Sequence, residues 1–160
     1  MDIFDAAKLN IVEDLKEFLK NEDPNVRDQR GSTPLIIASY YNNVAAVQLI
    51  IDSGADINAK DAMGNTALMG VSFKGYSLCA LTLLKGGANV NETNNNGAGA
   101  LTFASTFGHF DIAEMLVQYG ADLISKDRFG KNPIDYAKIQ ENDKCYEYLV
   151  SVLKKNSIKN

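Results

Sequence analysis

The sequence predicts an all-α solenoid of about five stacked helix–turn–helix repeats, joined by short hairpin-like turns. Three sets of residues with one spacing support this prediction. The first set recurs every 33 residues and consists of Gly31, Gly64, Gly97 and Gly130. The second set keeps the same interval and consists of Gly54, Gly87 and Gly120. The third is apolar and consists of Leu35, Leu68, Leu101 and Ile134. A fixed period of this length, with no gaps, indicates a chain built from repeated structural units.

Each repeat is expected to begin with a turn and a short helix. The turn is a D-x-x-G pattern, as at Asp28 and Gly31, where glycine tolerates positive φ. In the following segment, S-T-P-L-I-I-A-S at residues 32–39, Thr33 suits the N-cap and Pro34 suits the first helical position. Small residues inside these helices allow close packing: Ala38, Ala104 and Ala137.

A second helix is expected to complete each unit. Glycines such as Gly75 end the first helix, and apolar residues such as Val47 and Ile50 then recur with helical spacing. Gly54 and its equivalents follow this second helix, where a left-handed residue closes many helices. The predicted unit is therefore a turn, a short helix, a turn, a longer helix and a further turn.

Two glycines are expected to weaken first helices in the middle of the chain. Gly70 lies inside one first helix, and Gly99 lies at the start of another. Glycine is unfavourable in helices because it loses more backbone entropy than other residues. We therefore expect the middle of the stack to be locally softer than its ends.

The repeat unit resembles a known family. The run at residues 31–61, G-S-T-P-L-I-I-A-S-Y-Y-N-N-V-A-A-V-Q-L-I-I-D-S-G-A-D-I-N-A-K-D, resembles a complete ankyrin repeat. The resemblance implies one ankyrin-repeat domain over residues 1–160. Its parts are an N-terminal capping repeat at 1–27, full repeats at 28–60, 61–93 and 94–126, and a C-terminal capping repeat at 127–160. The histidine of the family's T-P-L-H motif is absent, since Ile36, Met69, Thr102 and Asp135 occupy that column.

The size and charge of the chain limit its possible functions. A length of 160 residues suits a single domain. A net charge of −4 gives no general attraction to nucleic acid or to anionic membranes. No apolar run reaches the roughly 18 residues of a membrane span. The first residues, M-D-I-F-D-A-A-K-L-N, do not resemble a secretory signal, so we expect a cytoplasmic protein.

The sequence offers no convincing catalytic, cofactor or metal site. The only histidine, His109, lies in a Gly-His pair at the start of a second helix, where a hydrogen-bonding structural role is expected. A lone histidine gives little support for a metal site. The segment beginning at Gly97 lacks the third glycine of a dinucleotide motif. We therefore expect a protein that is not an enzyme and binds no cofactor.

The two cysteines are expected to be buried and reduced. Cys79 and Cys145 occupy the same column of repeats that are not adjacent. Two steps along a stack separate them by on the order of 20 Å, because neighbouring helices pack about 8–10 Å apart. A disulfide needs Cα atoms within about 7 Å, so none is expected.

The resemblance places function on a concave groove formed by the turn tips and the ends of the first helices. The candidate partner-binding residues at these positions are Arg30, Tyr40, Tyr41, Met63, Phe73, Lys74, Phe107, Arg128 and Phe129. Aromatic residues and arginine are enriched in binding hot spots. All the groove positions together include six basic residues, Arg30, Lys60, Lys74, Lys126, Arg128 and Lys131, and no acidic one.

These positions predict a protein-binding module whose partner offers an acidic and apolar surface. The polar residues at the two ends of the chain, Asp2, Asp5 and Lys8 at one end and the K-K-N-S-I-K-N tail at the other, favour a monomer. No small-molecule substrate and no membrane association are expected. One alternative is a dedicated inhibitor or immunity-type protein that neutralises a single enzyme or toxin. A remote alternative is nucleic-acid binding, because basic and aromatic residues are interleaved.

Overall fold

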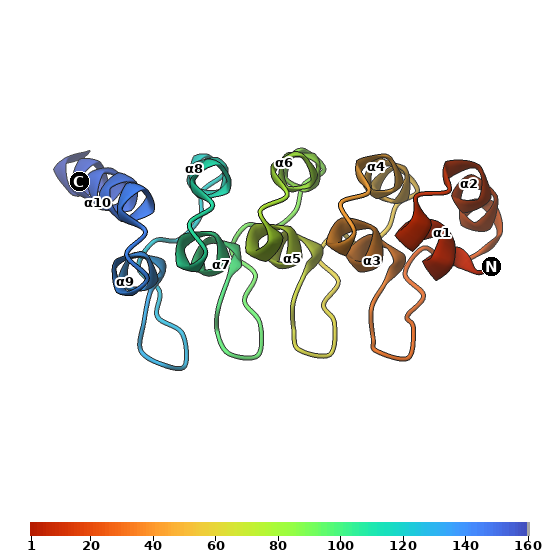
Figure 1. Ribbon diagram of the computed structural model, residues 1–160, viewed down its shortest axis with the longest axis horizontal. Coiled ribbons are helices and arrows are strands. Elements are labelled where there is room, and N and C mark those ends of the chain that lie inside the picture. The colour runs from red at the N-terminus through yellow and green to blue at the C-terminus, as the bar shows by residue number, and fades with distance from the viewer. Residues whose placement is uncertain (160) are drawn as a thin grey trace.

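The computed structural model describes residues 1–159; Asn160, the last residue of the expected C-terminal cap, lies outside them. The described residues form ten helices and no strand, which confirms the predicted all-α class. Five helix pairs follow one another in a single row from the N-terminus to the C-terminus (Figure 1). The helices are α1 Ile3–Leu9, α2 Val12–Asn21, α3 Pro34–Tyr40, α4 Val44–Asp52, α5 Ala67–Lys74, α6 Ser77–Lys85, α7 Ala100–Thr106, α8 Phe110–Gln118, α9 Pro133–Ile139 and α10 Asp143–Lys159.

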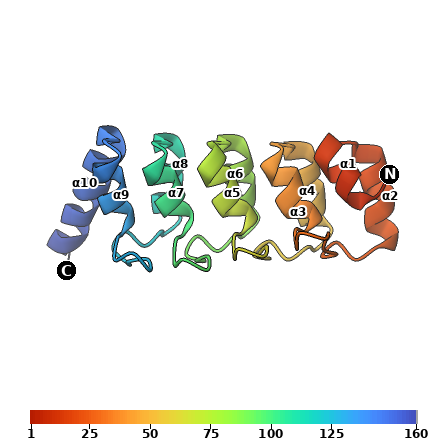
Figure 2. The ribbon, with the colours of Figure 1, turned by 60° about the horizontal axis from the view of Figure 1, so that its bottom comes forward.

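The helices form two layers with different surroundings. The odd-numbered helices form an inner layer, in which α1, α3, α5, α7 and α9 each contact the next. The even-numbered helices form the outer layer, and long loops extend from the inner layer on the opposite side (Figure 1). Figure 2 shows the same loops along one edge of the row. The inner helices therefore lie between a layer of helices and a row of loops.

The first helices begin as the sequence predicts. The side-chain oxygens of Thr33 and Thr66 accept the N–H of Ile36 and Met69, each over 3.3 Å. Gly99 occupies the equivalent N-cap and has no side chain to offer. Its own N–H instead donates to the Thr102 hydroxyl over 3.3 Å, so α7 has only half of the usual capping arrangement.

The two glycine series occupy left-handed backbone. The glycines of the turn tips have φ between +74° and +81°, and those that follow the second helices have φ between +89° and +97°. At Gly64 the tip also packs closely against the next one, because an added Cβ would lie 2.8 Å from the Asn95 backbone nitrogen. Only glycine satisfies both conditions without strain.

An asparagine ladder joins successive repeats on the loops. The side-chain oxygens of Asn25, Asn58 and Asn91 accept the backbone N–H of Asp56, Asn89 and Asp122, over 2.7, 2.8 and 2.8 Å. The donors and acceptors follow the 33-residue period, so an asparagine side chain serves the same purpose at the first three of the four junctions between repeats. These bonds fix the position of each loop relative to the next.

Small side chains allow the core to pack closely. Ala38, Ala104 and Ala137 are fully buried between helices, as expected. Cys79 and Cys145 are buried and free, which confirms that they form no disulfide. None of the helices over residues 1–159 has the length and apolar character needed to cross a membrane.

Candidate functional site

Four predicted aromatic residues lie at the exposed ends of successive inner helices. Tyr40 and Tyr41 end α3, Phe73 lies in the last turn of α5, and Phe107 ends α7. Their side chains are between 42% and 50% exposed, although most large apolar side chains of the repeats are buried. We call these four residues the aromatic face. Since they lie at helix ends and away from the core, the fold does not require aromatic rings at these positions.

The rings of the aromatic face contact one another and nearby cations. Phe73 and Phe107 pack edge to face with ring centroids 4.8 Å apart. Tyr40 and Tyr41 form a similar pair at 5.3 Å. The ammonium group of Lys74 lies 4.5 Å from the Tyr40 ring centroid, which links α5 to α3. Such contacts hold exposed rings in place before a partner arrives.

The remaining predicted residues lie on the turn tips, at residues 28–31, 61–64 and 127–130. Met63 is 66% exposed and Phe129 is 60% exposed. Arg128 lies 5.3 Å from the Phe129 ring and donates to the Asn96 side chain over 3.0 Å. Arg30 lines a cavity that Tyr40 and Tyr41 also border. The structure therefore brings together the helix-end residues and Arg30, and leaves the other tip residues along the loop edge.

The prediction that this surface lacks acidic residues is wrong at its N-terminal end. A cavity of about 580 Å³ lies between the first turn tip and the helices α1 and α3. Its charged lining residues are Asp5, Lys8, Asp28, Arg30 and Asp61. The sequence pattern assigned to the surface the residues within and beside each D-x-x-G turn, but not its aspartate. The turn aspartates themselves also reach it.

Lys60 is also less available to a binding partner than the sequence suggested. Its ammonium group lies 3.1 Å from the Glu92 carboxylate and donates to the Thr93 carbonyl over 2.7 Å. Both partners belong to the next repeat, so Lys60 holds two loops together. The basic character of the groove is therefore weaker than the count of basic residues implied.

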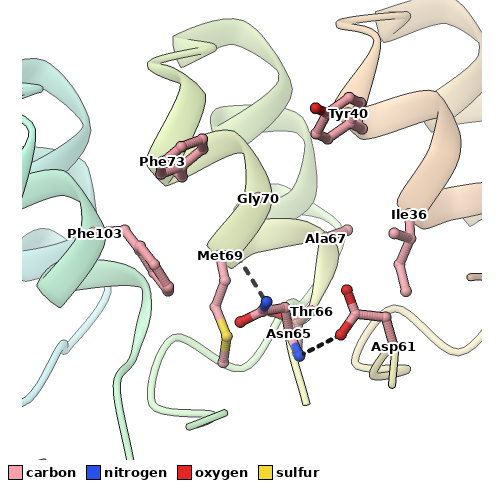
Figure 3. Close-up of a pocket in the computed structure, with 10 residues that line it drawn as sticks. All are labelled: Ile36, Tyr40, Asp61, Asn65, Thr66, Ala67, Met69, Gly70, Phe73 and Phe103. Carbon is pink, nitrogen blue, oxygen red and sulfur yellow. Dashed lines mark hydrogen bonds between the residues drawn. The ribbon is translucent and has the colours of Figure 1, made fainter. Parts of the chain in front are cut away.

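A second cavity, of about 260 Å³, lies over the middle of α5 (Figure 3). Its lining residues are Ile36, Tyr40, Asp61, Asn65, Thr66, Ala67, Met69, Gly70, Phe73 and Phe103. Figure 3 shows Gly70 between Phe103 on α7 and Tyr40 on α3. Sequence reasoning missed Phe103 and Asp61 as surface residues. The available signal was Gly70, where the helix lacks a side chain in the middle of the groove.

The comparison with known families agrees with this architecture. A family model described as ankyrin repeats (3 copies) matches residues 3–94 and 71–160, which together span nearly the whole chain. The chain belongs to the ankyrin-repeat family. Ankyrin repeats are in general protein-interaction modules and are generally not catalytic. No curated protein sequence matches the chain significantly.

Cys79 and His109 of this ankyrin-repeat chain both have structural surroundings. Burial raises the pKa of the Cys79 thiol to about 11, so this thiol is protonated near pH 7 and is a poor nucleophile. His109 begins α8, and its Nε2 atom lies 3.0 Å from the Phe73 carbonyl oxygen, in agreement with the expected structural role. Within residues 1–159, no cluster of three His, Cys, Asp or Glu residues could hold a metal.

A hydrogen-bonded pair with shifted pKa values joins the last turn tip to α9. The Tyr136 hydroxyl donates a hydrogen bond to Asp127. Burial, together with this bond, raises the pKa of Tyr136 to about 12. Burial alone would raise the pKa of Asp127, but the bonds from Tyr136 and from the N–H groups of Lys131 and Phe129 hold it below its usual value. The pair therefore holds the turn against α9.

Proposed function

We propose that the chain is a non-catalytic, monomeric, cytoplasmic module that holds a protein partner in the concave groove between the turn tips and the inner helices. The observation that carries this proposal is the aromatic face, Tyr40, Tyr41, Phe73 and Phe107. Four large rings are about half exposed and adjacent, and they come from three successive inner helices. Contiguous exposed apolar surface marks interaction sites in soluble proteins.

The contacts of these rings favour binding over a purely structural role. Phe73 already packs against Phe107 and Phe103, so little side-chain entropy remains to be lost when a partner covers it. Lys8 and Lys74 lie over the Tyr41 and Tyr40 rings and present positive charge beside apolar surface. The partner surface that fits is apolar at its centre, with acidic groups facing these lysines.

Two double variants test this proposal. Phe73→Ala with Phe107→Ala removes half of the aromatic face. The control is Leu78→Ala with Tyr119→Ala, which removes similarly exposed apolar side chains, 61% and 45% exposed, from the outer helices. Each protein is immobilised and exposed to lysate from the native source, and retained proteins are identified by mass spectrometry. We expect one or more proteins to be retained by the wild type and the control and lost with the Phe73/Phe107 variant.

The same assay contains the results that would contradict the proposal. If every retained protein binds the Phe73/Phe107 variant as well as it binds the wild type, the aromatic face is not the binding surface. If the retained material is nucleic acid whose binding falls steeply with salt, the partner belongs to a different class. Circular dichroism melting of all three proteins shows whether a loss of binding reflects unfolding.

A further inference from the structure

The cavity over α5 has the size and lining of a site for one side chain. Its volume of about 260 Å³ is below the roughly 300–1,000 Å³ of pockets for drug-sized ligands. Most of its lining is apolar and comes from α3, α5 and α7. Asp61, at the base of a turn tip, supplies a carboxylate at one side (Figure 3).

The cavity exists because one repeat lacks a side chain that the others have. Gly70 occupies a column in which the neighbouring repeats place Ile37, Phe103 and Tyr136, each separated by 33 residues. A Cβ atom added at Gly70 would meet no atom within 4 Å. The empty volume is therefore the place of a side chain that the repeat pattern would supply.

The last repeat shows which side chain can fill this position. Tyr136 lies on α9 at the position equivalent to Gly70, and its hydroxyl donates to the Oδ2 atom of Asp127. Asp127 precedes Tyr136 by nine residues, as Asp61 precedes Gly70. The structure thus contains one filled example of the arrangement that is open at Gly70.

The carboxylate of Asp61 is held in the same way as that of Asp127 and can accept the same hydrogen bond from a tyrosine hydroxyl. Its Oδ1 atom accepts the N–H groups of Met63 and Asn65, each over 2.9 Å, as the Oδ1 atom of Asp127 accepts two N–H groups of its own turn. In Asp127 the second oxygen accepts the tyrosine hydroxyl. Among residues 1–159, no hydrogen bond reaches the second oxygen of Asp61.

We infer that the cavity over Gly70 receives a tyrosine side chain of the protein partner, with its hydroxyl donated to Asp61 and its ring between Phe103 and Tyr40. This inference rests on the proposed function and specifies the anchor that the partner inserts. The negative charge of Asp61 disfavours a glutamate or a phosphorylated tyrosine in the same place. The apolar walls disfavour a strongly hydrated side chain.

Small probes test the cavity without the partner. The probes are p-cresol, which is the side chain of tyrosine, and toluene, which is that of phenylalanine. Each is titrated into 15N-labelled protein, and amide shifts are followed by NMR. We expect p-cresol to shift the amides of Met69, Gly70 and Phe103, with a dissociation constant on the order of millimolar, as a ligand of this size allows. Toluene should bind about tenfold more weakly, because it makes no hydrogen bond to the carboxylate.

Three variants locate the probe. Gly70→Tyr places a tyrosine of the chain itself in the cavity, in the manner of Tyr136, and should abolish the p-cresol shifts. Gly70→Ala adds only a methyl group and should retain them. Asp61→Asn should keep the turn, since Asn94 makes the same two backbone bonds at the equivalent position, over 2.9 and 3.1 Å. It should reduce the preference for p-cresol over toluene, because a neutral amide NH2 group replaces the carboxylate oxygen that accepts the phenol O–H.

Several outcomes would overturn the inference. One is equal binding of p-cresol and toluene to the wild type. Another is p-cresol shifts that persist in the Gly70→Tyr variant. A third is an n-butylammonium ion, the side chain of lysine, that shifts the same amides more strongly than p-cresol does. These results concern the cavity alone, so the inference can fail while the Phe73/Phe107 variant still shows that the aromatic face binds a protein.

Discussion

The hydrogen bond between Tyr136 and Asp127 stabilises the last turn over a defined pH range. The pKa of Asp127 is lowered, so its contribution is complete above the usual carboxyl pKa near 4 and is lost as the pH falls through the lowered value. The pKa of Tyr136 is raised to about 12, so its contribution is complete below pH ~10 and is lost as the pH rises toward 12. The pair is therefore most stabilising between these limits.

Replacing Tyr136 with Phe should destabilise the fold in a pH-dependent manner. We expect a loss of about 1 kcal/mol near pH 7, since the bond involves a charged group that is partly exposed to solvent. The loss should shrink as the pH falls below about 4 and through the lowered pKa of Asp127, and again as the pH rises above about 10 toward the raised pKa of Tyr136. Urea unfolding of both proteins across this range measures the difference. A difference that does not vary with pH would contradict the assignment.

Single residues also explain where sequence reasoning about the site was incomplete. The positions of Tyr40, Phe73 and Phe107 could be predicted because the 33-residue register identifies the ends of the inner helices. The surface positions of Phe103 and Asp61 could not be predicted, because residues in their repeat columns usually pack in the core or stabilise the turn. They border a cavity only because Gly70, which lies on α5 in the same repeat as Asp61 and next to α7, has no side chain. That effect depends on contacts in three dimensions.

At the scale of the helix, the two glycines of α5 have opposite requirements. Gly75 ends the helix with φ of +81°, and an added Cβ would lie 2.7 Å from the His109 ring. Gly70 lies inside the helix, where an added Cβ meets nothing. Backbone geometry therefore requires glycine at position 75. At position 70 glycine is not required, and it makes the helix less stable than another residue would.

Alanine at these two positions should change stability in opposite directions. Gly70→Ala should stabilise the protein by about 0.5–1 kcal/mol, because alanine loses less backbone entropy in a helix. Gly75→Ala should destabilise it by at least about 1–2 kcal/mol, because the left-handed conformation and the contact with His109 both oppose a Cβ. Chemical denaturation measures both values. Stabilisation by Gly75→Ala would contradict the left-handed backbone and close contact at Gly75. Destabilisation by Gly70→Ala would contradict the open space at Gly70.

Three inner helices, α1, α5 and α7, are also tied to the outer helix of the next repeat. The Asn43 side chain donates to the carbonyls of Ala7 and Lys8, and the Asn142 side chain donates to those of Ser105 and Thr106. His109 is in the same column and binds the Phe73 carbonyl. The histidine thus replaces an asparagine in a structural bridge that also holds the end of α5, where the aromatic face lies.

The bridge predicts that His109 can be replaced by asparagine but not by alanine. His109→Ala should lower the free energy of unfolding by about 1 kcal/mol or more, since it leaves a helix-end carbonyl without its partner. His109→Asn should retain most of the stability, as Asn43 and Asn142 do in their repeats. Thermal and urea unfolding distinguish the two. Equal losses for both variants would mean that ring packing, and not the hydrogen bond, is the main contribution of His109.

At the scale of the whole molecule, the fold could be predicted almost completely and the binding surface only in part. Periodic columns fix the fold because each repeat uses the same turn, caps and small core residues, such as Thr33 and Ala38. Surface charge is less predictable because it depends on pairing between repeats. Lys60 is held by Glu92, and Asp61 reaches a groove that the sequence alone suggested was free of acidic residues.

The central claim is that the aromatic face is the binding surface of this ankyrin-repeat protein. Its most direct test is the dissociation constant of a protein retained by the wild type, measured by calorimetry for the wild type, Phe73→Ala/Phe107→Ala and Leu78→Ala/Tyr119→Ala. Loss of hot-spot residues weakens binding by roughly 30-fold or more. We predict such a loss for the first variant and a change within about twofold for the second. Equal affinities for all three folded proteins would contradict the claim.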